Sequence, residues 1–198
     1  MNVSRREVRD LTVAWLALGL AFAFFESRVS AATIADVVTT TAFVEEILLS
    51  LATVGVAFLL HELAHKVVAL RFGQHAEFRA DYGMLALAVA GGLAGFLFAA
   101  PGAVHHRGYI TPREHGLIAL AGPATNVGLA VVSLGLFPFA PSIAARGLFI
   151  NVLLAGFNMI PFGPLDGATV LEWSTAAYAV AAVFTIGPAL WFFFGVGV

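Results

Sequence analysis

The sequence contains no cysteine, and this absence excludes a disulfide framework, thiolate metal sites and a cysteine nucleophile together. Charge is also scarce, because only 11% of the 198 residues are charged, against about 25% in an average soluble domain. The net charge of −2 leaves no basic field that could bind nucleic acid. Hydrophobic residues make up 60% of the chain and the mean hydropathy is +0.93, which excludes a disordered chain. The composition therefore indicates an integral protein of the lipid bilayer.

Apolar stretches divide the chain into candidate membrane crossings. A helix needs about twenty mainly apolar residues to cross a bilayer, so the length allows about five or six transmembrane helices. The stretches cover residues 8–28, 47–72, 82–104, 115–139, 144–160 and 168–198. We expect an all-α polytopic membrane protein that forms one domain, residues 1–198, with Pro188 as a kink in the last stretch. A secretory signal peptide is an alternative for the first stretch, because its start is basic and its apolar core is short.

The stretch at residues 82–104 is broken by Gly-Gly, a further Gly and Pro-Gly. Such breaks suit a re-entrant segment that returns on the side where it entered, whereas a spanning helix with glycine at its contacts is the alternative. With a cytoplasmic N-terminus, the re-entrant path leaves only Arg28 and Arg146 of the ten basic residues outside. A full crossing weakens this bias by moving Arg107 and Arg113 outside. We therefore expect a cytoplasmic N-terminus in the cell membrane of a prokaryote, with residues 73–81 and 105–114 also cytoplasmic.

The segment His61-Glu62-Leu63-Ala64-His65 has the form H-E-x-x-H inside an apolar stretch. Residues i and i+4 share a helix face, so both imidazoles can reach one metal ion. Zinc binds neutral imidazole nitrogen, and Glu62 beside the first histidine can accept a proton from water at the metal. Ionisable residues within an apolar helix are costly and usually mark function, although these could merely cap the cytoplasmic end of the helix. The motif therefore predicts a zinc site.

A catalytic zinc ion usually has three protein ligands and a water molecule, so a third ligand must come from elsewhere. Several carboxylates are expected on the opposite side of the membrane or at its interface: Glu26, Glu45, Glu46, Glu77 and Asp81. Asp166 lies in the segment 158–167, which contains two prolines and two glycines. Such irregular backbone at membrane depth lines a cavity or packs on protein, although a plain turn fits the local sequence equally well. A re-entrant 82–104 brings Asp166 to the side of His61, so the charge bias and the metal site favour the same topology.

The chain resembles the site-2 protease family of intramembrane zinc metalloproteases over about residues 45–170. Three motifs, in this order and spacing, carry the resemblance: His61-Glu62-Leu63-Ala64-His65, Ala121-Gly122-Pro123-Ala124-Thr125-Asn126 and Asn158…Pro161…Pro164-Leu165-Asp166-Gly167. The resemblance implies Zn²⁺ bound by three ligands, His61, His65 and Asp166. It further implies Glu62 as general base and a role for Asn158 near the scissile peptide. A helix containing Gly122, Pro123 and Asn126 would pack beside the metal helix.

The resemblance predicts a zinc endopeptidase that cuts a transmembrane segment of a membrane protein, so its partners are that substrate and the bilayer. A zinc enzyme of another lineage would take its third ligand from a later Glu, for which Glu172 is the candidate in the last stretch. A metal transporter would often show inverted repeats, which are not visible here. An inactive homologue that only binds membrane proteins would not need Glu62. The remaining histidines are expected at the membrane interface: His75, His105, His106 and His115.

Overall fold

The structure, a computed structural model, describes residues 3–30, 32–97 and 101–195. It is 74% helical, which agrees with the predicted helical membrane protein. Among the described residues, three helices are long and apolar enough to cross a membrane: Arg5–Glu26, Thr41–Arg71 and Pro112–Leu136. The full set of five to six crossings stays a prediction. The chain forms two compact units, the first with Met1–Leu59 and Glu77–His105 and the second with Leu60–Ala76 and His106–Val198.

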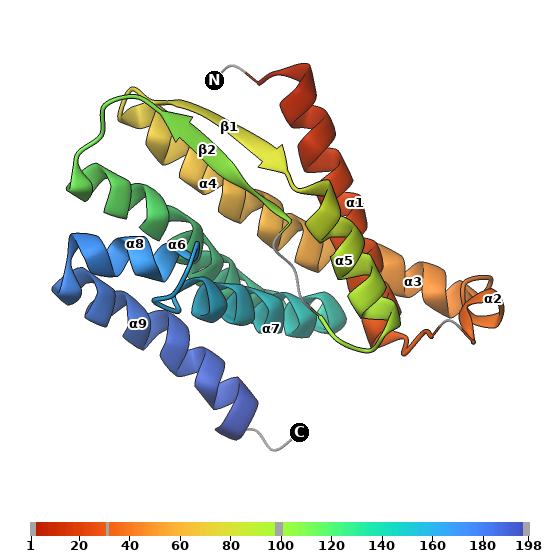
Figure 1. Ribbon diagram of the computed structural model, residues 1–198. Helices are drawn as coiled ribbons and strands as arrows, with labels where there is room; N and C mark the ends of the chain where they lie inside the picture. Colours follow the sequence, from red (N-terminus) through yellow and green to blue (C-terminus); the bar gives the residue numbers. More distant parts are fainter. Residues whose placement is uncertain (1–2, 31, 98–100, 196–198) are drawn as a thin grey trace. The chain divides into compact units, whose positions relative to one another are not determined.

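The first unit is built around α1 (Arg5–Glu26), which packs against α3, the π-helical segment η1 and α5 (Figure 1). The helical elements that follow α1 along the chain are α2 (Ile34–Val37), α3 (Thr41–Ser50), η1 (Leu51–Gly55), α4 (Val56–Arg71) and α5 (Tyr82–Leu93). The apolar stretch expected to begin at residue 47 therefore begins its helix at Thr41. The side chain of Thr40 caps this helix by accepting a hydrogen bond from the backbone N–H of Phe43. Glu46 is tolerated inside the helix because its carboxylate accepts a hydrogen bond from Ser50 one turn later.

Two strands, β1 (His75–Ala80) and β2 (Gly102–Arg107), pair into a small sheet that the sequence analysis did not anticipate. Their arrows run in opposite directions in Figure 1. The backbone N–H of Asp81 donates to the carbonyl of Pro101 at 3.1 Å, so the intervening segment returns to the place that it left. Its helix α5 has 12 residues and is about 18 Å long, which is short against a hydrocarbon core of about 30 Å. Whether residues 82–104 re-enter or cross the membrane stays a prediction.

The second unit contains the end of α4 and the helices that follow the sheet: α6 (Pro112–Leu136), α7 (Pro141–Asn158), α8 (Asp166–Trp173), α9 (Thr175–Leu190) and the π-helical η2 (Trp191–Gly195). Helix α6 packs against α7 and α8, and α9 also packs against α7 and α8 (Figure 1). The last apolar stretch is divided at Ser174, and Pro188, the expected kink, lies inside α9 shortly before η2. Ser174 has extended backbone and its side chain caps α9, so it ends one helix and begins the next.

Candidate metal centre

Three side chains of the second unit converge on one point: His61 and His65 from α4, and Asp166 from the start of α8. The Nε2 atoms of the two histidines lie 2.9 Å apart. The Oδ2 atom of Asp166 lies 3.3 Å from Nε2 of His61 and 3.4 Å from Nε2 of His65. The structure thus brings together the three residues that the family resemblance implies as ligands, although Asp166 is about a hundred residues distant along the chain.

The other ring nitrogen of each histidine is held by a hydrogen-bond acceptor. Nδ1 of His61 lies 2.6 Å from Oδ1 of Asn126, and Nδ1 of His65 lies 2.7 Å from the carbonyl oxygen of Ile118. Each Nδ1 must therefore carry a proton and donate it, because neither acceptor has a proton to give. In the neutral imidazoles, both Nε2 atoms then present lone pairs toward the site.

The orientation of Asn126 follows from a chain of hydrogen bonds that ends on a backbone carbonyl. Nδ2 of Asn151 donates to the carbonyl oxygen of Gly147 at 2.8 Å, which leaves Oδ1 of Asn151 as an acceptor. Nδ2 of Asn126 donates to that oxygen at 2.8 Å, which turns Oδ1 of Asn126 toward His61. Since a carbonyl oxygen can only accept, the direction of every bond in this chain is fixed. Asn126 and Asn151 are both buried, so their amides have no competing water. Asn151 is a positioning residue that the sequence analysis missed.

Gly122 provides the room in which the two histidines approach α6. A Cβ atom at this position would lie 2.5 Å from both Cε1 and Nε2 of His61, and closer still to Nε2 of His65. Any larger side chain would therefore displace the atoms that face the site. The motif that contains Gly122 and Asn126 acts in two ways, because the glycine clears the space and the asparagine orients the ring that fills it.

Asp166 is placed by the packing of α8 rather than by its own local sequence. Gly167 allows the start of α8 to lie against the end of α7, since a Cβ atom there would overlap the carbonyl oxygen of Met159. At the other end of α8, the ring of Trp173 covers Gly116 on α6. Between them, Val170 and Met159 form a buried apolar cluster with α6. These contacts fix the helix that carries the carboxylate.

The donor set fits a zinc ion. Two imidazole lone pairs and a carboxylate oxygen face one another without a proton between them, and Oδ2 of Asp166 is buried with no hydrogen-bond partner. Ligand atoms about 2.0–2.1 Å from a tetrahedral zinc ion would lie about 3.3–3.4 Å from one another. The two separations from Oδ2 of Asp166 to the histidine nitrogens match this value, and the separation of 2.9 Å between the two nitrogens is shorter. This donor set indicates zinc as the cofactor of the protein. A bound cation removes the repulsion among the three groups.

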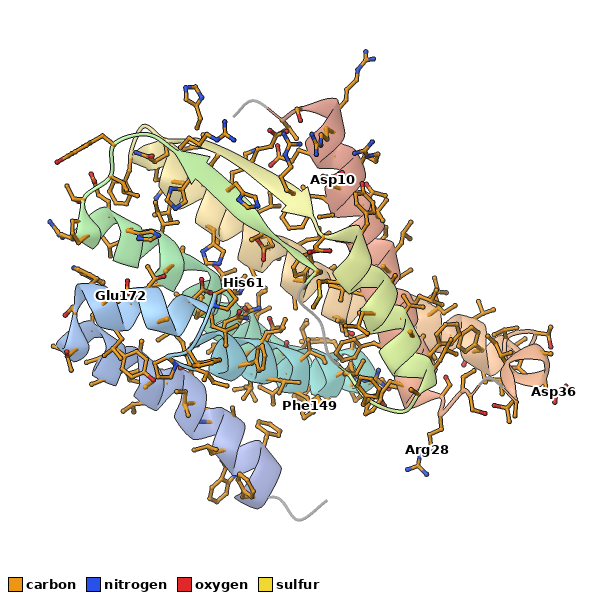
Figure 2. All side chains as sticks on the ribbon, viewed as in Figure 1. Asp10, Arg28, Asp36, His61, Phe149 and Glu172 are labelled. Atoms are coloured by element: carbon orange, nitrogen blue, oxygen red, sulfur yellow. The ribbon has the colours of Figure 1, made fainter. Side chains whose placement is uncertain are left out.

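Of the other residues predicted for the site, two lie on the helices that surround the metal centre and one lies apart from it. Glu62 is buried on α4 next to His61. Asn158 ends α7, and its Nδ2 donates to the carbonyl of Leu154 at 3.0 Å. Glu172, the alternative third ligand, is exposed on α8 and lies apart from His61 in Figure 2. It is also absent from the only group of potential ligands found within the described residues.

Two other carboxylates considered as ligands have different partners in the first unit. Asp81 caps α5 by accepting from the backbone N–H of Met84 at 2.9 Å. Glu77 pairs with Arg79 and accepts a hydrogen bond from Ser4. Their carboxylates are therefore engaged in holding local structure.

Comparison with curated proteins finds relatives that carry names of the form "Putative zinc metalloprotease". MJ0611 of Methanocaldococcus jannaschii is 39% identical over 199 residues, which cover 96% of this chain and 96% of that protein. Rip2 of Mycolicibacterium smegmatis is 30% identical over 202 residues, covering 80% of this chain and 75% of that protein. YwhC of Bacillus subtilis is 29% identical over 148 residues, covering 61% and 66%. No family model and no solved structure matches the chain.

Proposed function

The chain belongs to the site-2 protease family of zinc metalloproteases, and from this we propose that it is an intramembrane endopeptidase. Its substrate is a membrane protein, cut at a peptide bond within or near a transmembrane segment. The observation that carries the proposal is the convergence of His61, His65 and Asp166 within the length of a helix apolar enough to cross a membrane. Ionisable residues within a membrane-spanning helix are costly, so metal ligands at this depth indicate a function inside the membrane.

The depth of the site supports cleavage inside the membrane. Helix α4 ends at Arg71, and His61 lies ten residues earlier, about 15 Å along the helix axis. Since the hydrocarbon core is about 30 Å thick, this places the ligands well below the membrane surface when Arg71 is at the interface. With a cytoplasmic N-terminus, α4 ends on the cytoplasmic side, and water reaches the site from there.

Each site residue has a distinct role in the hydrolysis. His61, His65 and Asp166 hold the zinc ion, which when bound supplies Lewis acidity that polarises a carbonyl group and lowers the pKa of water. Glu62 is the general base: its carboxylate takes a proton from the attacking water molecule. It then gives that proton to the amine that leaves when the peptide C–N bond breaks. Asn126 keeps His61 in the tautomer that can bind the metal.

The substrate must present an accessible carbonyl group to this site. The carbonyl groups of an intact helix accept hydrogen bonds from residues four positions later, so the substrate helix has to unwind locally. Asn158 lies directly before the segment that leads to Asp166, and we assign it a role in holding the unwound backbone. Its Oδ1 atom can accept from a peptide N–H while Nδ2 stays bonded to Leu154.

The proposal is tested by incubating the purified protein with a model transmembrane substrate in detergent and mapping the products by mass spectrometry. We expect a cut within the apolar segment that is abolished by a zinc chelator and restored by added zinc. Cuts confined to the soluble flanks of the substrate would contradict an intramembrane site. Zinc binding without any cleavage of several such substrates would instead indicate a homologue that only binds membrane proteins.

A further inference from the structure

A groove of about 350 Å³ lies between α4 and α6 in the second unit, outside the metal centre. Its lining is almost entirely apolar and comes from both helices: Val68, Phe72, Leu117, Leu120, Ala121 and Ala124. The groove is open rather than enclosed, and both helices are long and apolar enough to cross a membrane. A groove of this kind faces lipid rather than water, and its lining offers no partner for a peptide backbone.

One end of this groove carries Arg71, and helix geometry places Arg113 beside the same end. Arg71, on the last turn of α4, is part of the lining. Arg113 lies one turn before Leu117 on the same face of α6, because residues four and seven apart share a helix face. The two helix ends are adjacent, because the side-chain amide Nε2 of Gln74, just after α4, donates to the carbonyl of Tyr109, just before α6, at 2.7 Å.

Both guanidinium groups are available to a ligand. Arg71 and Arg113 are both exposed to the surroundings of the protein. Neither forms an ion pair in the part of the chain that the structure describes. The nearest acidic neighbour of Arg113 in sequence, Glu114, is committed to the capping box of α6 with Thr111. Two exposed positive charges thus stand at the mouth of an apolar groove.

We propose that this groove binds an anionic phospholipid, with an acyl chain along the apolar lining and the phosphate between Arg71 and Arg113. Guanidinium groups bind phosphate through paired, charge-assisted hydrogen bonds. Basic pockets between transmembrane helices on the cytoplasmic side are suited to acidic headgroups. The two features have the order that a phospholipid requires, with the charge at the helix ends and the apolar surface toward the membrane interior.

The groove shares both of its helices with the metal centre, which gives the bound lipid a consequence. His65 lies three residues before Val68 on α4, and Gly122 directly follows Ala121 on α6. An acyl chain in the groove therefore lies along the contact between α4, which carries two metal ligands, and α6, where Gly122 gives those ligands room. We expect the lipid to stabilise the pairing of α4 with α6 against thermal unfolding.

The test is lipid retention by the full-length protein, measured by native mass spectrometry with phosphatidylglycerol, phosphatidylcholine or inorganic phosphate as the probe. We expect phosphatidylglycerol to bind and raise the melting temperature, and Arg71→Gln and Arg113→Gln each to weaken its binding at least tenfold. Arg28→Gln is the matched control, since Arg28 is an exposed arginine of the first unit (Figure 2). Equal retention of phosphatidylcholine, or binding of phosphate as strong as that of the lipid, would overturn the proposal.

A second pair of variants tests the groove without changing charge. Ala124→Phe fills the apolar lining, whereas Val131→Phe adds the same ring to an exposed position on α6 beyond the groove. We expect Ala124→Phe to lose phosphatidylglycerol and Val131→Phe to retain it, with the zinc content of each showing that the fold is kept. Unchanged lipid binding by a folded Ala124→Phe protein would refute the groove as the site. Displacement of the lipid by a model transmembrane peptide would show that the groove takes substrate instead.

Discussion

Nδ1 of His61 lies 2.6 Å from Oδ1 of Asn126, a residue 65 positions later in the chain. This contact determines which nitrogen of His61 faces Asp166. A histidine whose second nitrogen is not held can rotate or change tautomer, and either change costs metal affinity. The asparagine is in turn held by Asn151, so the orientation of a ligand on α4 depends on side chains from two other helices.

The first prediction follows from that contact. Asn126→Ala removes the acceptor that holds His61, so we expect zinc affinity to fall by about 10- to 100-fold, the usual cost of losing such a partner. A competition titration with a chromophoric chelator measures the affinity. Thr125→Ala is the control, because the hydroxyl of Thr125 donates to the carbonyl of Ala121 on its own helix. Equal zinc affinity of the Asn126→Ala and wild-type proteins would remove Asn126 from the metal centre.

The second prediction concerns the third ligand. Asp166→Ala should lose most of its zinc, because two imidazoles alone leave the site without its carboxylate. Glu172→Ala should keep about one zinc ion per chain, since Glu172 is exposed on the same helix and outside the cluster. Metal analysis of the two purified variants decides between them. Full zinc occupancy in Asp166→Ala with loss in Glu172→Ala would assign the protein to the other lineage of zinc enzymes.

The third prediction concerns the general base. Glu62→Gln replaces a buried carboxylate with an amide of similar size, so it removes the proton acceptor without creating a cavity. We expect unchanged zinc content and cleavage of the transmembrane substrate reduced at least about 100-fold, within the range of general base catalysis. Zinc analysis and a cleavage assay on the same preparation are the measurements. Loss of zinc together with activity would make Glu62 a structural residue, and near-normal cleavage would place the base elsewhere.

The fourth prediction concerns the first unit, where a buried carboxylate holds the sheet. Asp10 on α1 accepts from the hydroxyl of Tyr82 at 2.7 Å and from the backbone N–H of Ala80 at 3.4 Å. Asp10→Ala removes a buried carboxylate that accepts both hydrogen bonds, and a hydrogen bond to a charged group contributes about 1.5–3 kcal/mol. We expect a melting temperature several degrees lower, measured by differential scanning fluorimetry. Asp36→Ala on the exposed helix α2 (Figure 2) should change it little, and equal stability of the two variants would contradict this role of Asp10.

The fifth prediction concerns membrane topology. The absence of native cysteine makes single-cysteine labelling unambiguous. His75 begins β1 and Tyr109 follows β2. We expect His75→Cys and Tyr109→Cys to react from the cytoplasmic side, and Thr39→Cys to react from the other side. Membrane-impermeant maleimide applied to intact cells and to inverted vesicles distinguishes the two sides. Labelling of positions 75 and 109 from opposite sides would mean that residues 82–104 cross the membrane.

Some expectations from the sequence needed correction because apolar periodicity does not show what a polar side chain contacts. Lys66, one of the eight basic residues on the expected cytoplasmic side, is buried on α4, which the apolar pattern does not reveal. Glu7 is likewise buried near the start of α1, where it accepts from the backbone N–H of Phe78 at 3.1 Å. The strands were missed because each has only six residues and contains charged or histidine side chains. Such short strands form when they pair, and pairing is not a local property.

The sequence by itself determined the class of protein and the core of its site. The high mean hydropathy of the chain requires a lipid bilayer as its surroundings. The spacing of His61 and His65 places two imidazoles on one helix face in any fold that keeps the helix. Only the tertiary structure decided which carboxylate joins them and how they are oriented. Asp166 and Glu172 sit on the same short helix, and the packing of α8 against α6 and α7 brings only the first to the histidines. The link through Asn126 and Asn151 depends in the same way on contacts between separate helices, and no local pattern encodes a distance through space.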